Sequence, residues 1–353
     1  MAQNVHPLVF GPLGRRITHL VASPDGRTLA FKHIPQNYST DDYHDVLYRK
    51  AGDTYVDLGE LPTPPPIGYG YSEAMQRADF APLDDGQCLS LETGPHSIAL
   101  ARYAPAESGL VEAARWNIGG TLSLVGATLR LRPSGQEVVV HISDRDDKNV
   151  DWGGGPPPDF PQSYLWIDVT SGKKLEKFHI TSSDAGVSIP GFCNPGGVSS
   201  LVSLGAPSWT GARELREGQA IDKILESLSG QKDFPIRAGR RRLLTRMRVI
   251  EIGSGQTLLQ LADDEPQMSL MRVYPRFHVL SPDENHALST VPGGHFELWN
   301  VTDRSSWRPS LPPHGGVHCA VFLPGARAAL GTAEGGVIVV DCTPGLEPGC
   351  IPW

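Results

Sequence analysis

The stretch Ser23-Pro-Asp-Gly-Arg-Thr-Leu-Ala-Phe31 decides the fold of this chain. It follows an apolar run, Ile17–Ala22, and its last residues begin a second apolar run. Asp-Gly between two such runs predicts a hairpin, because glycine tolerates the positive φ of a tight turn. Another pair of runs comes next, Val46–Lys50 and Thr54–Leu58, with Ala51-Gly-Asp53 between them. The region therefore predicts a unit of four antiparallel strands.

The four-strand unit recurs along the chain. Repeats of about 40 to 60 residues with four short strands each are typical of the blades of a β-propeller. The sequence predicts an all-β fold, a single β-propeller domain over residues 1–353 with six blades, although a seventh could lie within the long fourth unit. The predicted blades cover residues 16–61, 78–117, 124–181, 186–262, 274–312 and 315–353.

Two of the six units leave open which segments supply their strands. In the fourth unit the expected strands are Val187–Phe192, Ser199–Leu204, Arg246–Ile252 and Thr257–Leu261. The sixth unit has no obvious fourth strand. Either the N-terminal segment 7–10 (Pro7–Phe10) closes the ring, or Cys350–Trp353 does.

The repeats resemble those of the WD-repeat and WD-like β-propeller superfamily. Ser23–Phe31 matches the pattern between the first two strands of such blades, and Ser281-Pro-Asp283 is a weaker version. Trp299-Asn300 stands at the Trp-Asp position of the fifth unit, and Val340 replaces the Trp in the sixth. No intact Trp-Asp dipeptide occurs in the chain. The resemblance implies a propeller that displays binding loops, and it implies a structural role for His314.

Composition excludes several classes of protein. With 39 Gly and 31 Pro among 353 residues, the chain cannot be mostly helical. A net charge of -8 disfavours general nucleic-acid binding. The five Cys contain no CxxC pair, and the sequence shows no catalytic, phosphate-binding or metal-binding motif, so we expect no cofactor and no metal. With no signal peptide or transmembrane segment recognised, we expect a cytoplasmic protein.

The long connections all join second to third strands or one blade to the next, so they are predicted to share one face. Loops carry function more often than scaffolds do, and this face is therefore the predicted partner-binding surface. Tyr43 lies on the first of these loops. The long connections are Ile34–Asp45, Gly59–Arg77, Asp144–Ser163, Gly205–Thr245 and Ala262–Pro275.

Two of the loops combine proline runs with aromatic residues. Pro62–Pro66 precedes Tyr69 and Tyr71, and Trp152 precedes Pro156–Pro158 and Phe160. Proline stiffens a loop by fixing φ, and exposed Tyr or Trp side chains are frequent interface anchors. These aromatic residues are predicted partner contacts, with stiff connectors packed on a blade as the alternative.

The insertion 205–245 is the largest loop and is predicted to hold a helix followed by a basic segment. Apolar residues at helical spacing predict the helix over Ala212–Ser229, which either packs on the propeller or binds a partner. Trp209 precedes the helix as a further predicted contact. The basic segment could hold an acidic partner, a phosphate or nucleic acid, or be a solvated hairpin. Its predicted contacts are Arg237, Arg240, Arg241 and Arg242.

The sequence therefore favours a non-catalytic scaffold or adaptor that binds a protein partner through the loop-rich face. One alternative is an enzyme with a metal-assisted hydrolase or lyase site at the mouth of a propeller channel. A weaker alternative is RNA or phospholigand binding through the arginines between Arg237 and Arg248. The sequence indicates neither the partner nor the oligomeric state.

Overall fold

All the regular secondary structure in the described residues is β-strand. The computed structural model describes residues 8–35, 43–64, 76–94, 97–119, 124–131, 134–144, 161–181, 235–238, 241–245, 247–261, 278–290, 296–308, 311 and 315–342. These ranges contain no helix, hence none long and apolar enough to cross a membrane. They form six four-stranded sheets, each an antiparallel meander. The predicted helix at 212–229 lies outside the described residues.

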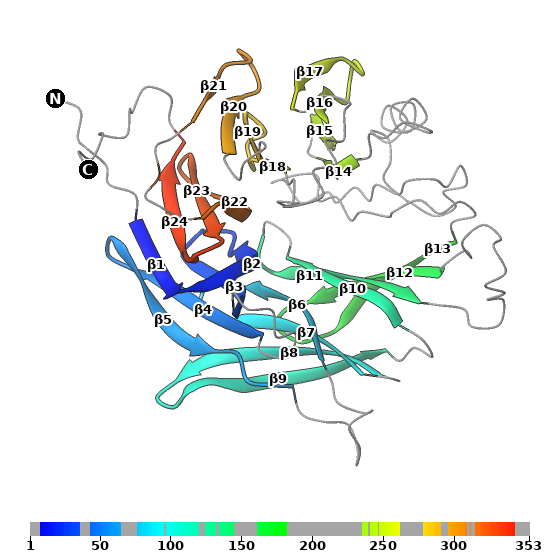
Figure 1. Ribbon diagram of the computed structural model, residues 1–353. Coiled ribbons are helices and arrows are strands. Elements are labelled where there is room, and N and C mark those ends of the chain that lie inside the picture. The colour runs from blue at the N-terminus through cyan, green and yellow to red at the C-terminus, as the bar shows by residue number, and fades with distance from the viewer. Residues whose placement is uncertain are drawn as a thin grey trace, which may run out of the picture. The chain divides into compact units, whose positions relative to one another are not determined.

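The chain divides into two compact units, which we describe separately: residues 1–57 with 220–353, and residues 58–219. The first unit holds four sheets (Figure 1). One sheet comprises β2 (Arg15–Ala22), β3 (Thr28–Pro35), β4 (His44–Ala51) and β5 (Thr54–Glu60), the last of which runs into the second unit. The second comprises β14 (Pro235–Ala238), β15 (Arg242–Thr245), β16 (Arg248–Glu251) and β17 (Thr257–Gln260). The third comprises β18 (His278–Leu280), β19 (His286–Thr290), β20 (Phe296–Asn300) and β21 (Ser306–Trp307).

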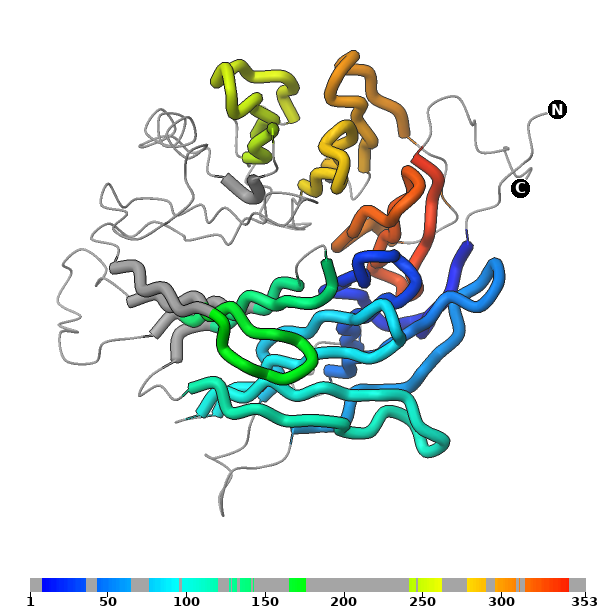
Figure 2. Tube along the Cα trace, turned by 180° about the vertical axis from the view of Figure 1, so that it is seen from behind, coloured from blue at the N-terminus to red at the C-terminus, as the bar shows by residue number. Residues whose placement is uncertain are grey.

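The fourth sheet of this unit joins the two ends of the chain. It comprises β22 (Val317–Leu323), β23 (Arg327–Thr332), β24 (Gly335–Asp341) and β1 (Leu8–Leu13), and β1 pairs antiparallel with β24. Figures 1 and 2 both show the blue first strand beside the red last strand. Of the two segments that the sequence left open for the missing strand, the N-terminal one occupies this place. Phe10 of β1 reaches the neighbouring sheet, where its ring stacks on Tyr55 with centroids 4.7 Å apart.

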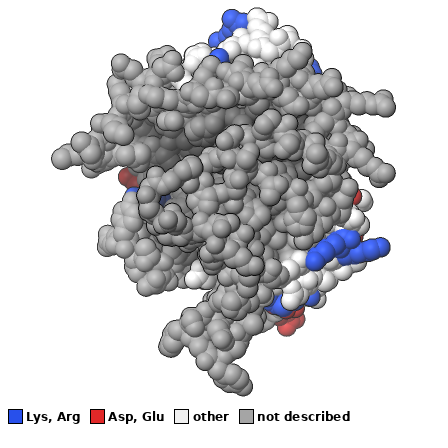
Figure 3. Space-filling view, turned by 90° about the vertical axis from the view of Figure 1, so that its right-hand side faces the viewer, with Lys and Arg blue, Asp and Glu red and all other residues white. Residues whose placement is uncertain are grey.

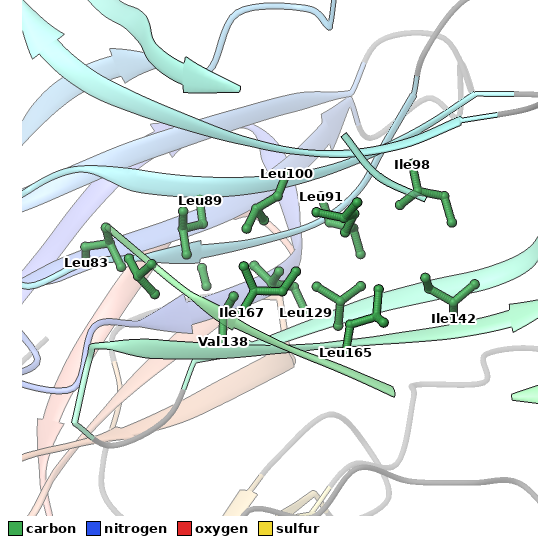
Figure 4. Packing of buried hydrophobic residues seen from close by; sticks show 14 residues of the cluster. Leu83, Leu89, Leu91, Ile98, Leu100, Leu129, Val138, Ile142, Leu165 and Ile167 are labelled. Atoms are coloured by element: carbon green, nitrogen blue, oxygen red, sulfur yellow. The ribbon is translucent and has the colours of Figure 1, made fainter. Parts of the chain in front are cut away.

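The second unit holds the remaining two sheets. One comprises β6 (Gln76–Pro82), β7 (Cys88–Gly94), β8 (Ser97–Ala106) and β9 (Gly109–Gly119). The other comprises β10 (Leu124–Leu131), β11 (Glu137–Asp144), β12 (Pro161–Asp168) and β13 (Lys174–Thr181). Leu89, Leu91 and Leu100 of the first sheet face Leu129 and Leu165 of the second across a buried apolar layer (Figure 4). Burial of this layer supplies the main stabilisation of the unit.

Apolar layers of the same kind join the sheets of the first unit. Phe31 of β3 packs with Val337 of β24, and Phe322 of β22 packs with Leu298 of β20. Leu244 of β15 lies in one cluster with Leu280. Because a four-stranded sheet has two apolar faces to cover, such stacking of sheets is what the repeat predicts.

The Ser-Pro-Asp turns have the same hydrogen bonds in two sheets. The Ser23 hydroxyl donates to Asp25 at 2.7 Å, and the Ser281 hydroxyl donates to Asp283 at 2.5 Å. Each serine oxygen also accepts the backbone N–H five residues later, at 3.0 and 2.9 Å. The turn position with φ near +60° is Gly26 in one sheet and Glu284 in the other. The predicted equivalence of the two units is therefore confirmed in atomic detail.

The fourth predicted unit differs in its first two strands. These strands are β14 and β15, not Val187–Phe192 and Ser199–Leu204, which lie outside the described residues. The sequence predicts that 235–245 belongs to the long insertion 205–245 and carries a basic segment. The structure instead buries Leu243 and Leu244 completely, so the arginines flank a core strand.

Candidate partner-binding surface

Each sheet has two unlike ends. We call the end with the first-to-second and third-to-fourth turns the turn end. The link end carries the second-to-third connection and the connections to other sheets. Turn-end connections have two to five residues in every sheet. Between the strands that the structure describes, all segments longer than five residues are at link ends: 36–43, 61–75, 145–160, 182–234, 261–277 and 308–316. The uneven distribution of segment lengths agrees with the prediction, except that residues 235–245 of the predicted fourth loop form β14 and β15.

A one-residue bulge marks the first strand of most sheets near its link end. The register shifts between Ile17 and His19 in β2, and between Arg77 and Asp79 in β6. It shifts again at Leu124/Gly126 of β10, Pro235/Arg237 of β14 and Val317/Cys319 of β22. A bulge turns a side chain out of the regular alternation, and bulges are over-represented beside functional sites. Nothing in the sequence pattern indicated these bulges.

Tyr43, the one predicted contact residue whose side chain is described on a link-end loop, is exposed. Half of its surface is accessible, and the Lys32 ammonium lies 5.6 Å from its ring centroid. Lys32 also lies 3.8 Å from a carboxylate oxygen of Asp45. Lys32 therefore contacts one face of the Tyr43 ring, and half of the residue stays accessible. Exposed aromatic rings of this kind are frequent anchors of protein interfaces.

Two histidines that the sequence analysis did not single out lie at the same link end. His33 of β3 is directly opposite His44 of β4, and their rings are nearly parallel with centroids 5.2 Å apart. His33 is buried and His44 is half-buried. Recognising the pair from sequence requires the β3–β4 register, which was not predicted.

Two predicted basic contacts lie at a turn end instead. Arg241 and Arg242 stand at the turn between β14 and β15, and their backbone N–H groups both donate to Glu284 Oε2 at 2.9 Å. The Arg242 side chain is buried and donates to the Glu284 carbonyl and, at 3.3 Å, to the Thr302 hydroxyl. These contacts join two neighbouring sheets. Arg242 is therefore a structural residue, and only Arg241 is exposed.

The remaining predicted contacts cannot be placed. Arg237 belongs to β14, but its side chain is outside the described part. The others lie wholly outside the described residues: Tyr69, Tyr71, Trp152, Phe160, Trp209 and Arg240.

The reactivity of the described residues depends on their cysteine thiols and on the grouping of side chains that could bind a metal. Burial raises the pKa of the Cys319 and Cys342 thiols to about 12, so both are protonated at neutral pH and are poor nucleophiles. Within the described ranges, no group of three or more His, Cys, Asp or Glu side chains lies close enough to hold a metal. Where Figure 3 shows described residues, a few Lys or Arg side chains lie beside Asp or Glu side chains near the lower edge of the view.

Comparison with known proteins identifies relatives by structure alone. No family model and no curated protein matches the sequence. Among solved structures, the WD40 β-propeller domain of Doa1 matches over 96% of this chain and 97% of its own, with 10% identity and a TM-score of 0.45. Pyrococcus horikoshii acylaminoacyl peptidase matches over 93% of this chain and 51% of its own, with 9% identity and a TM-score of 0.50. With its six four-stranded meanders, the described part of the chain has the fold of a β-propeller of about six blades.

Proposed function

We propose that this chain is a cytoplasmic, non-catalytic scaffold that binds a protein partner through the link ends of its sheets. The observation that carries the proposal is the distribution of connection lengths, because every connection longer than five residues is at a link end. Variable loops on a rigid β scaffold are a common way to build a binding surface. The fold alone does not specify this function.

Two further features support the proposal. Tyr43 presents an exposed aromatic ring at a link end, and such rings supply much of the binding energy at protein interfaces. The bulges in the first strands lie at the same ends and redirect side chains there. The turn ends, by contrast, are closed by short turns whose polar groups bond to one another.

Affinity capture from the native lysate tests the proposal. The full chain is compared with Tyr43→Ala and with a variant in which residues 211–230 are replaced by a short Gly/Ser linker, leaving β14 and β15 intact. Arg49→Ala is the matched control, because Arg49 is also exposed and lies near the turn end of the same strand, β4.

We expect one discrete protein to be captured by the wild type and by Arg49→Ala. With the purified partner, Tyr43→Ala should raise Kd about tenfold, the effect of losing an ordinary interface anchor. Equal capture by all the variants would place the partner elsewhere on the chain. Capture of nothing by any of them would contradict the scaffold proposal.

A further inference from the structure

Polar side chains around Glu92 contact one another across one face of the β6–β9 sheet. We call Glu92, Ser90, Tyr103 and Arg115 the Glu92 cluster. Glu92 is fully buried, and its Oε1 accepts hydrogen bonds from the Tyr103 hydroxyl at 2.8 Å and the Ser90 hydroxyl at 3.1 Å. Its Oε2 lies 2.8 Å from Nη2 of Arg115, which is also 2.7 Å from Glu112. A buried carboxylate needs such partners, because losing one leaves charge uncompensated in a medium of low polarity. This arrangement is therefore rigid.

Arg77 continues this row of polar contacts from the Glu92 cluster to the 61–75 connection, which leads into β6. Its Nε donates to the Ser90 hydroxyl oxygen at 2.8 Å, and its Nη2 donates to the carbonyl oxygen of Pro62 at 2.5 Å. The guanidinium carbon lies 5.8 Å from the Tyr103 ring centroid. Burial and the hydrogen bond to Glu92 raise the pKa of Tyr103, so the ring stays neutral beside Arg77. Three contacts thus hold one side chain in place.

Arg77 and Pro62 stand at the two ends of one long connection. Pro62 follows the buried Leu61, where the connection leaves the β2–β5 sheet, and Arg77 is the second residue of β6. The side chain of Arg77 therefore closes the base of residues 61–75. That segment carries the Pro62–Pro66 run and the predicted contacts Tyr69 and Tyr71.

We propose that Arg77 is a positioning residue, which ties the two ends of the 61–75 connection together and is itself held by the Glu92 cluster. We call this arrangement the Arg77 clamp, and it follows from the hydrogen bonds of Arg77 to Pro62 and Ser90. The further step, that it presents Tyr69 and Tyr71 to a protein partner, rests on the proposed function. The planar guanidinium of Arg77 can donate to the Ser90 hydroxyl and the Pro62 carbonyl at the same time, because its N–H groups point in fixed, different directions. A lysine ammonium has no such fixed arrangement of donors.

Chymotrypsin cleavage after Tyr69 and Tyr71, followed by mass spectrometry, tests the clamp. A protease must bind several residues on each side of the cut in extended form, so a segment tied at its base is cut slowly. Cleavage then follows the population of the opened state. We expect Arg77→Lys to speed cleavage at these bonds at least tenfold, and Ser90→Ala about threefold. Arg102→Lys is the matched control, because Arg102 stacks on Trp116 in the same sheet outside the Glu92 cluster.

The outcomes separate the clamp from the proposed function. Faster cleavage in Arg77→Lys at an unchanged Tm, with weaker capture of the partner, supports both. Faster cleavage with unchanged capture supports the clamp and contradicts a role of this segment in binding. An unchanged cleavage rate overturns the clamp. If Arg77→Lys fails to fold, Ser90→Ala decides, and an unchanged rate in that variant overturns the proposal equally.

Discussion

The turn ends and link ends of the sheets are built from the same strands but follow different rules. At the turn ends, residues such as Ser23 and Ser281 repeat one hydrogen-bond pattern, and close contacts such as that of Arg242 with Glu284 join neighbouring sheets. At the link ends, connection lengths run from a single residue, Gly14, to the segment 182–234. The difference supports the proposal that the turn ends hold the sheets together, while the link ends bind a partner.

The largest effect is expected at a turn end, from Gly172→Ala. Gly172 has φ +67°, and a Cβ there would lie 2.1 Å from the Trp116 ring of the neighbouring sheet. Left-handed strain and overpacking together should lower the free energy of unfolding by about 4 kcal/mol. Urea unfolding measures the loss. Gly52→Ala is the control, because Gly52 also has positive φ but open space around it, and it should lose only about 1 kcal/mol.

Glu92→Ala probes a buried charge cluster in the β6–β9 sheet that reaches toward a link end. The substitution removes one of the two carboxylates beside Arg115 and the acceptor of the Tyr103 and Ser90 hydroxyls. We expect a loss of about 3 kcal/mol in the free energy of unfolding. Glu112→Ala is the comparison, because Glu112 is exposed and its loss should cost less than about 1 kcal/mol. Similar losses in the two variants would mean that the Glu92 cluster is not a rigid anchor.

Ser23→Ala and Ser281→Ala test whether the two repeated turns are energetically equivalent. Each removes one hydroxyl that donates to an aspartate and accepts a backbone N–H. Both should cost about 1.5 kcal/mol, and the double variant should cost their sum because the sites share no partner. Thermal and urea unfolding provide the values. Strongly unequal losses would show that the turns match in geometry but not in contribution.

The stability of the link end of β22 is expected to depend on pH through His318, which lies at the bulge of this strand. Burial, and secondarily the charge of Arg16, lowers its pKa below the ordinary value. The unfolded chain therefore binds more protons below about pH 6.5, and stability should fall as pH drops through that range. His318→Asn should flatten this slope in unfolding measured from pH 5 to 7. An unaltered slope would assign the acid sensitivity to other groups.

The smallest effect on stability is expected from Tyr43→Ala at a link end. Half of the Tyr43 surface is already exposed, and its described contact is with a lysine. The free energy of unfolding should change by less than about 0.5 kcal/mol. A loss above about 2 kcal/mol in urea unfolding would make Tyr43 part of the scaffold rather than of a binding surface.

The sequence predicted best where local turn chemistry determines structure. Ser23-Pro-Asp-Gly26 locates its hairpin. The sixth unit had no obvious fourth strand, and the N-terminal segment that pairs there was one of two segments that the sequence offered. Prediction failed at β14 and β15, because burial of Arg242 depends on Glu284, which is distant in sequence. The bulges, the His33–His44 pair and the Arg77 clamp depend on strand register in the same way. For the proposed binding surface, the sequence predicted the long loops and Tyr43. It did not predict the side chains that contact them, Lys32 beside Tyr43 and Arg77 beside the 61–75 connection.

The central claim is that partners contact link ends and not turn ends, and site-specific photo-crosslinking tests it most directly. A photoreactive residue is placed at Tyr43, directly before β4, or at Arg49, near the turn end of β4, and both positions are exposed. We predict that a discrete protein from the native lysate crosslinks at position 43 and not at position 49. Equal crosslinking at both positions, or crosslinking at 49 alone, would contradict the account.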